Sequence, residues 1–219
     1  MRPVVGDQLK VLAPVLQRPY LTYVLDRLAE TGCGEVVLLT GHRADLIHQA
    51  LGETYGGMRL VHSAEPTPLG TGGALRRALP HLTSRLVLLL NGDSWCDVSL
   101  GDLCSFHRRR ATRLSLVLSP SADCARYGRV RVAADGRVKE FGEKSEAGGG
   151  WINAGIYLLD RGLIQEIAEG TPVSLERELL PTWVSRRERV HGFFCTGRFI
   201  DIGTPESYAK AERFFRLGA

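Results

Sequence analysis

Long hydrophobic runs are missing from this chain of 219 residues. Its densest apolar stretch, LVLLL at residues 86–90, is far shorter than the roughly 20 residues that a membrane-spanning helix needs. The N-terminus also lacks the basic region followed by an apolar run that marks a secretory leader. We therefore expect a soluble cytoplasmic protein with no membrane partner.

Cysteine is present without a pattern. The five cysteines are an odd number, none forms a C-x-x-C pair, and they scatter through apolar or loop positions. This arrangement argues against a disulfide framework and a zinc site, and it fits a reducing compartment. The six histidines likewise show no metal-binding spacing such as H-E-x-x-H.

A large surplus of one charge is also missing, because 28 basic residues face 24 acidic ones and leave a net charge of +4. This mild surplus suits phosphate-bearing ligands. Basic residues do not interleave with aromatic ones and no nucleic-acid-binding motif occurs, so we expect no nucleic-acid partner. We interpret the run Arg108 to Arg110 and the cluster Arg186, Arg187 and Arg189 as solvated helix faces.

The sequence does contain an alternation of helical and strand patterns. Helices are predicted at residues 19–34, 43–57 and 72–82, and strands at residues 35–41, 58–65 and 85–93. The strands are short and continuously apolar, which is typical of parallel strands buried on both faces. We predict a Rossmann-like, doubly wound α/β fold with a mixed, mostly parallel sheet and helices on both of its faces.

The pattern changes after residue 111. Strands or hairpins are predicted at residues 112–120, 128–144 and 151–160, where a D-G turn and a glycine-rich break occur, and helices return at residues 174–186 and 205–217. No internal repeat, low-complexity tract or linker divides the chain. Residues 1–219 are therefore predicted to form a single domain.

Two aspartates stand at the ends of apolar segments. Asp93 follows the strand LVLLL, and ligands of open α/β sheets bind at the carboxyl ends of strands. Asp93 either supplies an oxygen ligand to Mg²⁺ or caps the next turn. Asp201 ends RFID, and the following Thr204 and Pro205 are explained by helix initiation, whereas Asp201 is not. Sequence spacing leaves open whether the two aspartates meet at one cation.

The stretch EPTPLGTGGALRRAL joins a glycine-rich loop to a helix. This arrangement predicts backbone N–H groups that are exposed to an anion or to a flat base. The loop is not a Walker motif, because no Gly-Lys-Ser/Thr follows it. Glycine-rich turns are common, so the loop alone does not decide the function.

In order along the chain, RPVVGDQLKVLAPV, EPTPLGTGGA, LLNGD, RYGRV, DGRVKEFGEK, WINAGIY and FIDIGTP resemble the sugar-1-phosphate nucleotidyltransferase family. The segments LGTGGA and SLERELLP are most similar to the guanylyltransferases acting on mannose- or heptose-type 1-phosphates. The resemblance implies that a sugar 1-phosphate oxygen attacks the α-phosphorus of a nucleoside triphosphate, preferably GTP, and that pyrophosphate leaves. The sequence also allows a homo-oligomer.

The resemblance implies four catalytic residues. Asp93 and Asp201 would hold Mg²⁺, Lys10 would reach the triphosphate, and Lys144 would contact the sugar phosphate. No strong general base is needed, because the attacking phosphate oxygen is already ionised. Instead, Mg²⁺ and cationic side chains must offset the repulsion between two polyanions.

The resemblance also implies two sets of binding residues. The nucleotide set is Glu65, Gly70, Thr71 and Gly72 together with Asp93, and Glu65 is positioned to accept from guanine. The sugar set is Glu143, Lys144, Asn153, Gly155 and Glu176, with Tyr127 and Gly128 as a nearby wall. Plainer interpretations stay open, in which Asn153 is a turn residue, Tyr127 a core residue and Glu176 an acid at a helix N-terminus.

Family members carry a buried first strand and a loop of the type G-G-x-G-T-R-[L/M]-R-P before the segment that corresponds to VVGDQLK. Here the chain begins at Met1, so the expected strand and phosphate loop are missing, and Leu9 stands where the family usually has proline. We expect in-frame codons upstream of Met1 to encode both. Three hypotheses follow: an authentic enzyme, which the retained downstream residues favour; a non-catalytic nucleotide- or sugar-phosphate-binding relative; and, least favoured, a basic nucleic-acid-binding domain.

Overall fold

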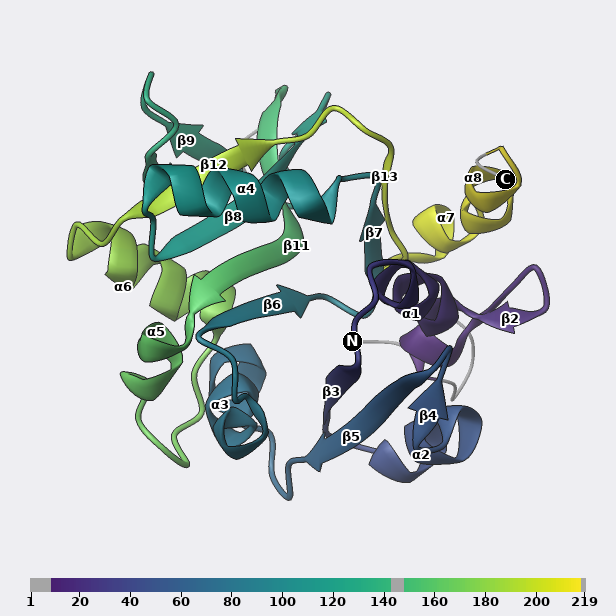
Figure 1. Cartoon of the computed structure of the whole chain (residues 1–219). Coiled ribbons are helices and arrows are strands. Elements are labelled where there is room, and N and C mark those ends of the chain that lie inside the picture. Colours follow the sequence, from purple (N-terminus) through teal and green to yellow (C-terminus); the bar gives the residue numbers. More distant parts are fainter. Residues whose placement is uncertain (1–8, 143–147, 218–219) are drawn as a thin grey trace. The chain divides into compact units, whose positions relative to one another are not determined.

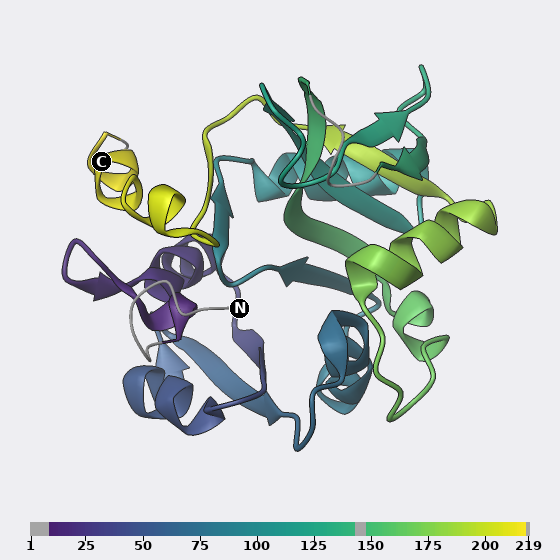
Figure 2. The same cartoon turned by 180° about the vertical axis from the view of Figure 1, so that it is seen from behind.

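The computed structural model describes residues 9–142 and 148–217, and their course is shown from two sides in Figures 1 and 2. The chain forms two compact units. Unit 1 comprises residues 1–67, 91–95 and 199–219, and unit 2 comprises residues 68–90 and 96–198. Each unit is described by itself, and the single domain predicted for residues 1–219 stays a prediction.

Unit 1 combines short strands with helices on its N-terminal and C-terminal segments. Its elements are η1 (Lys10–Leu12), β1 (Pro14–Val15), β2 (Arg18–Pro19), α1 (Tyr20–Glu30), β3 (Glu35–Thr40), α2 (Ala44–Leu51), β4 (Thr54–Tyr55), β5 (Met58–Ala64), the start of β7 (Ser94–Cys96), β13 (Phe199–Asp201), α7 (Pro205–Tyr208) and α8 (Ala211–Arg216). Strand β5 pairs in parallel with β3 and antiparallel with β4. Strand β13 is the hydrogen-bonded neighbour of β7.

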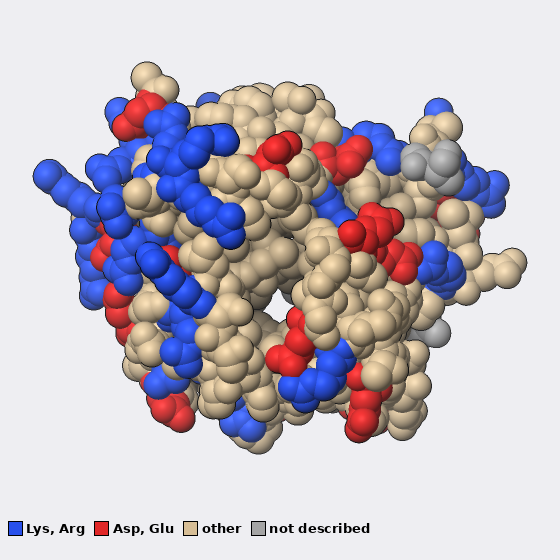
Figure 3. Space-filling view, in the orientation of Figure 1, with Lys and Arg blue, Asp and Glu red and all other residues tan. Residues whose placement is uncertain are grey.

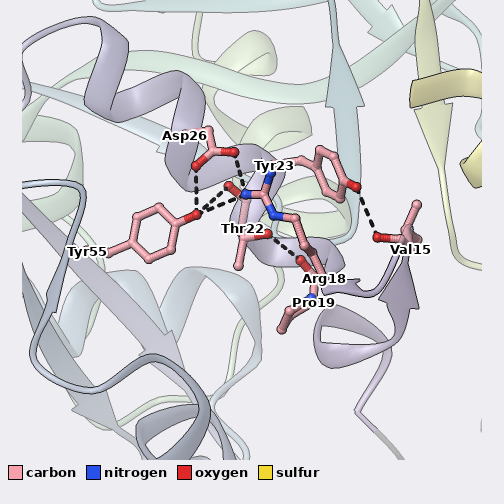
Figure 4. A network of polar contacts seen from close by, with 7 residues as sticks. All are labelled: Val15, Arg18, Pro19, Thr22, Tyr23, Asp26 and Tyr55. Atoms are coloured by element: carbon pink, nitrogen blue, oxygen red, sulfur yellow. Dashed lines mark hydrogen bonds and ion pairs between the residues drawn. The ribbon is translucent and has the colours of Figure 1, made fainter. Parts of the chain in front are cut away.

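The hairpin of β1 and β2 is fastened to the rest of unit 1 by a polar network (Figure 4). Arg18 donates to Asp26 of α1 at 2.6 Å and to the Tyr55 hydroxyl at 3.1 Å. The Tyr55 hydroxyl in turn donates to Asp26 at 2.6 Å. Because Tyr55 lies in β4, one aspartate links the hairpin, a helix and a sheet.

Unit 2 contains the longer sheet. Its elements are α3 (Gly70–Arg77), η2 (Leu79–His81), β6 (Leu86–Leu90), α4 (Leu100–Arg110), β8 (Leu114–Ser121), β9 (Val130–Val132), β10 (Val138–Phe141), β11 (Gly150–Asp160), α5 (Arg161–Gln165), the π-helical turn η3 (Leu175–Leu179), α6 (Leu180–Ser185) and β12 (Val190–Phe194). The sheet has the order β12-β8-β11-β6. Strand β12 runs parallel to β8, whereas β11 runs antiparallel to both β8 and β6.

The core of unit 2 lies on this sheet. Residues 114–119 of β8 are all buried, because the strand is central and apolar side chains alternate with only two serines. Helix α4 covers one face, in front of the sheet in Figure 1 and behind it in Figure 2. In the described part of the chain, β6 and β3 each hydrogen-bond to one strand only, so both are edges of their sheets.

The predicted Rossmann-like, mixed α/β fold is confirmed, with parallel pairs in both units and a β9–β10 hairpin around the D-G turn. Antiparallel pairing is more frequent than a mostly parallel sheet implies, because β11 is reversed between its neighbours. The helix predicted for residues 43–57 is wrong beyond Leu51. Residues 54–55 instead form β4, which turns back onto β5 through two glycines with positive φ.

Basic side chains gather over α4 and α6 in Figure 3. Arg108, Arg109 and Arg110 are exposed on the last turn of α4, and Arg186 and Arg187 are exposed just after α6. Arg108 to Arg110 thus form the predicted solvated helix face, whereas Arg186, Arg187 and Arg189 are exposed after the end of α6 and not on a helix. Among the described residues, no helix is long and apolar enough to cross a bilayer.

Candidate active site

The structure brings Asp93 and Asp201 together in unit 1. Asp93 directly precedes β7, Asp201 is the last residue of β13, and these two strands are hydrogen-bonded neighbours. The amide of Ile202 donates to the carbonyl of Asp93 at 2.9 Å. Two carboxylates that lie 108 positions apart in the sequence therefore come from adjacent backbone segments.

A buried tyrosine marks the same place. Tyr20 begins α1, its side chain is fully buried, and its hydroxyl has no hydrogen-bond partner within the described residues. Burial, followed by the negative charges of Asp93 and Asp201, raises the pKa of Tyr20. Both carboxylates thus lie close enough to act on one hydroxyl, and sequence reasoning missed Tyr20.

Lys10 offsets part of this negative charge. Its Nζ lies 3.9 Å from Oδ2 of Asp93, and the two side chains are 19% and 34% exposed. Gly92 allows the approach, since a Cβ there would stand 3.3 Å from Cγ1 of Val11, the residue after Lys10. The small residue at position 92 thus leaves room for η1.

Asp201 also takes part in the turn before α7. The expectation that helix initiation does not explain Asp201 is therefore corrected. Its Oδ1 accepts from the amide of Gly203 at 2.8 Å, forming a turn that leads into α7. Thr204 caps α7 through a capping box with Ser207, and Pro205 occupies the first turn, as predicted. Asp93, by contrast, leads into a strand and pairs with Lys10.

The paired aspartates fit a magnesium ion. Mg²⁺ prefers oxygen ligands and is commonly bound by one or two carboxylates plus substrate phosphates. Within residues 9–142 and 148–217, no group of three or more His, Cys, Asp or Glu side chains could hold a metal ion. Asp93 and Asp201 therefore supply the donor type that such a shared metal ion requires.

The glycine-rich loop of unit 2 is packed against residues 171–179. The carbonyl of Val173 accepts from the amides of Gly72 and Gly73 at 2.9 and 3.3 Å, and the amide of Val173 donates to Leu69 at 2.8 Å. This corrects the expectation that the loop exposes its amides, because those of Gly72 and Gly73 already have an acceptor. A role for Gly70, Thr71 and Gly72 at the nucleotide stays a prediction.

Thr71 joins this loop to Glu176. Its hydroxyl donates to Oε2 of Glu176 at 2.7 Å and accepts from the amide of Leu175 at 2.8 Å. Glu176 is half-buried in the first turn of the π-helical η3, a geometry that is rare and frequent at functional sites. Glu176 is therefore more than an acid at a helix N-terminus, because its carboxylate is held by Thr71, which lies 105 positions away in the sequence.

Asn153 and Gly155 sit at a bulge in β11. The register shifts between Asn153 and Tyr157, Gly155 has a φ of +75°, and its amide donates to Oδ1 of Asn153 at 3.1 Å. Nδ2 of Asn153 donates to the Tyr157 hydroxyl at 2.7 Å. Tyr157 is fully buried, and burial followed by the charge of Glu176 raises its pKa.

Two residues of the predicted sugar set, Asn153 and Glu176, therefore act on one tyrosine that sequence reasoning missed. The available signal was Tyr157's place in the same WINAGIY motif, four residues after Asn153. Asn153 is indeed a turn-type residue, and it also belongs to this network. Tyr127 and Gly128 form a turn whose amides both donate to Cys124, and a bridge between Arg129 and Ile152 sets that turn beside Asn153. Tyr127 is half-buried, so it is not a core residue.

The remaining predicted residues are placed as follows. Glu143 and Lys144 lie outside the described residues. The carboxylate of Glu65 lies over Gly41, where a Cβ would stand 2.8 Å from its Oε1. Glu65, Lys10, Asp93 and Asp201 thus belong to unit 1, and the glycine-rich loop and sugar set belong to unit 2.

A mixed α/β fold with paired carboxylates at strand ends is typical of enzymes that bind phosphate-bearing ligands. The sequence profile of the family described as "Nucleotidyl transferase" matches residues 1–216. The chain belongs to this family and is a nucleotidyltransferase.

The chain is similar to named guanylyltransferases in sequence and to a solved structure in fold. The chain is 33% identical to D-glycero-alpha-D-manno-heptose 1-phosphate guanylyltransferase of Aneurinibacillus thermoaerophilus, over 97% of this chain and 92% of that protein. It is 30% identical to mannose-1-phosphate guanylyltransferase of Mycobacterium tuberculosis, over 96% of this chain and 59% of that protein. The crystal structure of HddC from Yersinia pseudotuberculosis complexed with GMP-PN matches with a TM-score of 0.87 and 27% identity, over 98% of this chain and 93% of that one.

Proposed function

We propose that this nucleotidyltransferase moves the guanylyl group of GTP to a heptose- or mannose-type sugar 1-phosphate, giving a GDP-sugar and pyrophosphate. The observation that carries the proposal is the convergence of Asp93 and Asp201 beside Lys10. The guanylyltransferase relatives, which act on heptose and mannose 1-phosphates, supply the choice of nucleotide and sugar.

Asp93 and Asp201 would hold Mg²⁺, which supplies positive charge against the phosphates of both substrates. Lys10 would add a second positive charge at the same place, and its ion pair with Asp93 orients it there. The attacking oxygen belongs to an ionised phosphate, so the side chains need to position and neutralise the substrates without removing a proton. The reaction therefore needs no histidine or cysteine.

Sugar recognition is assigned to Asn153 and Glu176, with Glu143 and Lys144 completing it. A carboxylate and an amide supply the paired donors and acceptors that sugar hydroxyls require. Glu65 is assigned to guanine, because one carboxylate can accept from its N1–H and its N2 amino group together. The five free cysteines support a reducing cytoplasm as the site of the reaction.

The first experiment measures pyrophosphate release for each nucleoside triphosphate with mannose 1-phosphate, heptose 1-phosphate and glucose 1-phosphate. GTP with mannose or heptose 1-phosphate should react fastest. Glu65→Gln should lower the ratio of the rate with GTP to the rates with the other nucleoside triphosphates. Binding of both substrates without turnover would instead favour a non-catalytic relative.

The second experiment tests the acidic pair. Asp93→Asn and Asp201→Asn should each lose most Mg²⁺-dependent turnover, because an amide carries no charge to hold the ion. Asn at position 201 keeps the acceptor for Gly203, so the turn before α7 should survive. Asp45→Asn, an exposed aspartate of α2, is the matched control. Near-normal turnover in both Asp93→Asn and Asp201→Asn would show that these two residues do not hold the metal ion.

A further inference from the structure

We propose that Thr71 is a positioning residue for the sugar-binding carboxylate of Glu176, and that its hydroxyl donates no hydrogen bond to the nucleotide. The proposal rests on the proposed function for what Glu176 binds. It differs from the role that family resemblance gives to the glycine-rich loop, in which Thr71 belongs to the nucleotide.

The hydrogen-bonding capacity of the hydroxyl is the first argument. A threonine hydroxyl has one donor hydrogen and two acceptor lone pairs. The hydroxyl donates its hydrogen to Oε2 of Glu176 at 2.7 Å, and one lone pair accepts a hydrogen bond from the amide of Leu175 at 2.8 Å. The hydroxyl therefore has no hydrogen left for a phosphate oxygen or a base carbonyl.

The surroundings of Glu176 are the second argument. The Ser174 hydroxyl also donates to Oε2 of Glu176, at 3.3 Å, and the negative charge of Glu176 contributes to the raised pKa of the buried Tyr157. Tyr157 accepts from Nδ2 of Asn153 at 2.7 Å. Two hydroxyl groups, those of Thr71 and Ser174, thus hold the carboxylate of Glu176.

The backbone is the third argument. The carbonyl of Val173 accepts from Gly72 and Gly73, so the loop that carries Thr71 and the segment that carries Glu176 form one block. A Cβ on Gly70 or on Gly73 would come within 2.8 Å of a backbone oxygen of residues 171–173. Small residues in the loop therefore keep Thr71 close enough to hold Glu176.

The test compares Thr71→Val, which keeps the shape and loses both hydrogen bonds, with Thr71→Ser, which keeps the hydroxyl. Thr31→Val is the matched control, because that hydroxyl only closes the end of α1 on Leu28. In Thr71→Val the KM for the sugar 1-phosphate should rise roughly tenfold, the ratio that corresponds to about 1.4 kcal/mol. The KM for GTP should change less than about twofold, and Thr71→Ser should restore most of the loss.

A second readout needs no turnover. The urea midpoints of Thr71→Val, Glu176→Ala and the double variant should be non-additive, because each single change removes the hydrogen bond between the two side chains. Sugar 1-phosphate binding, measured by calorimetry, should weaken by the same factor as the KM. If the unaltered chain shows no turnover, the proposed function fails, and calorimetry with the midpoints still decides the role of Thr71.

Three results would overturn the proposal: additive midpoints, an unchanged sugar 1-phosphate affinity in Thr71→Val, or a rise in the KM for GTP alone. The last of these would return Thr71 to the nucleotide.

Discussion

Gly70 offers a test of how tightly the loop of unit 2 is packed. Its φ is +69°, and a Cβ there would lie 2.7 Å from the carbonyl oxygen of Val173. Gly170, in the same unit, has a φ of +70°, but a Cβ there would meet nothing within 4 Å. Replacing each glycine by alanine therefore imposes the same backbone strain, and only Gly70→Ala adds a steric conflict.

The magnitudes can be separated. A non-glycine residue in the left-handed region costs about 1–2 kcal/mol, which is the whole cost expected for Gly170→Ala. Gly70→Ala should cost about 1–3 kcal/mol more, because Val173 is held by backbone hydrogen bonds to Gly72 and Leu69 and cannot move away freely. Gly70→Ala should therefore lower the free energy of unfolding by about 3 kcal/mol in total.

Urea denaturation followed by far-ultraviolet circular dichroism measures both free energies of unfolding. Gly70→Ala should also raise the KM for the sugar 1-phosphate, since displacing Val173 moves the segment that carries Glu176. Equal losses of stability in the two variants would show that the loop and residues 171–173 are not in firm contact.

Two further predictions concern stability. Leu16 and Gln17 occupy both central positions of the β1–β2 turn, with φ of 47° and 64°. The double change Leu16→Asn with Gln17→Gly should therefore raise the free energy of unfolding by about 1–2 kcal/mol, which a higher urea midpoint would report. An unchanged midpoint would mean that the turn is not strained. Burial lowers the pKa of His107 below its ordinary 6.5, so the unfolded chain binds the proton more readily and stability should fall as pH drops below about 6.5. His107→Asn should flatten that fall, and an equal slope in both proteins would assign it to other groups such as His191, whose pKa is also lowered by burial.

Local patterns were sufficient for much of the fold. The apolar periodicity of α1 predicted a helix because it matches the face that α1 buries, and the apolar runs of β3, β5 and β6 predicted strands. Burial on both faces was wrong for β3 and β6, because among the described residues both are edge strands whose residues are mostly half-buried. The error at β4 had a local signal too. Gly56 and Gly57 both have positive φ, and a two-glycine turn between apolar residues is typical of a hairpin.

The sequence by itself determined the family, since the motifs occur in order along the chain, and it determined which residue types are available at each motif. Tertiary structure decided which of them meet. Asp93 and Asp201 come together only because β7 and β13 are neighbours, and Thr71 reaches Glu176 only because the glycine-rich start of α3 packs on Val173. Such contacts span about half of the chain, and sequence spacing carries no information about distances across a fold.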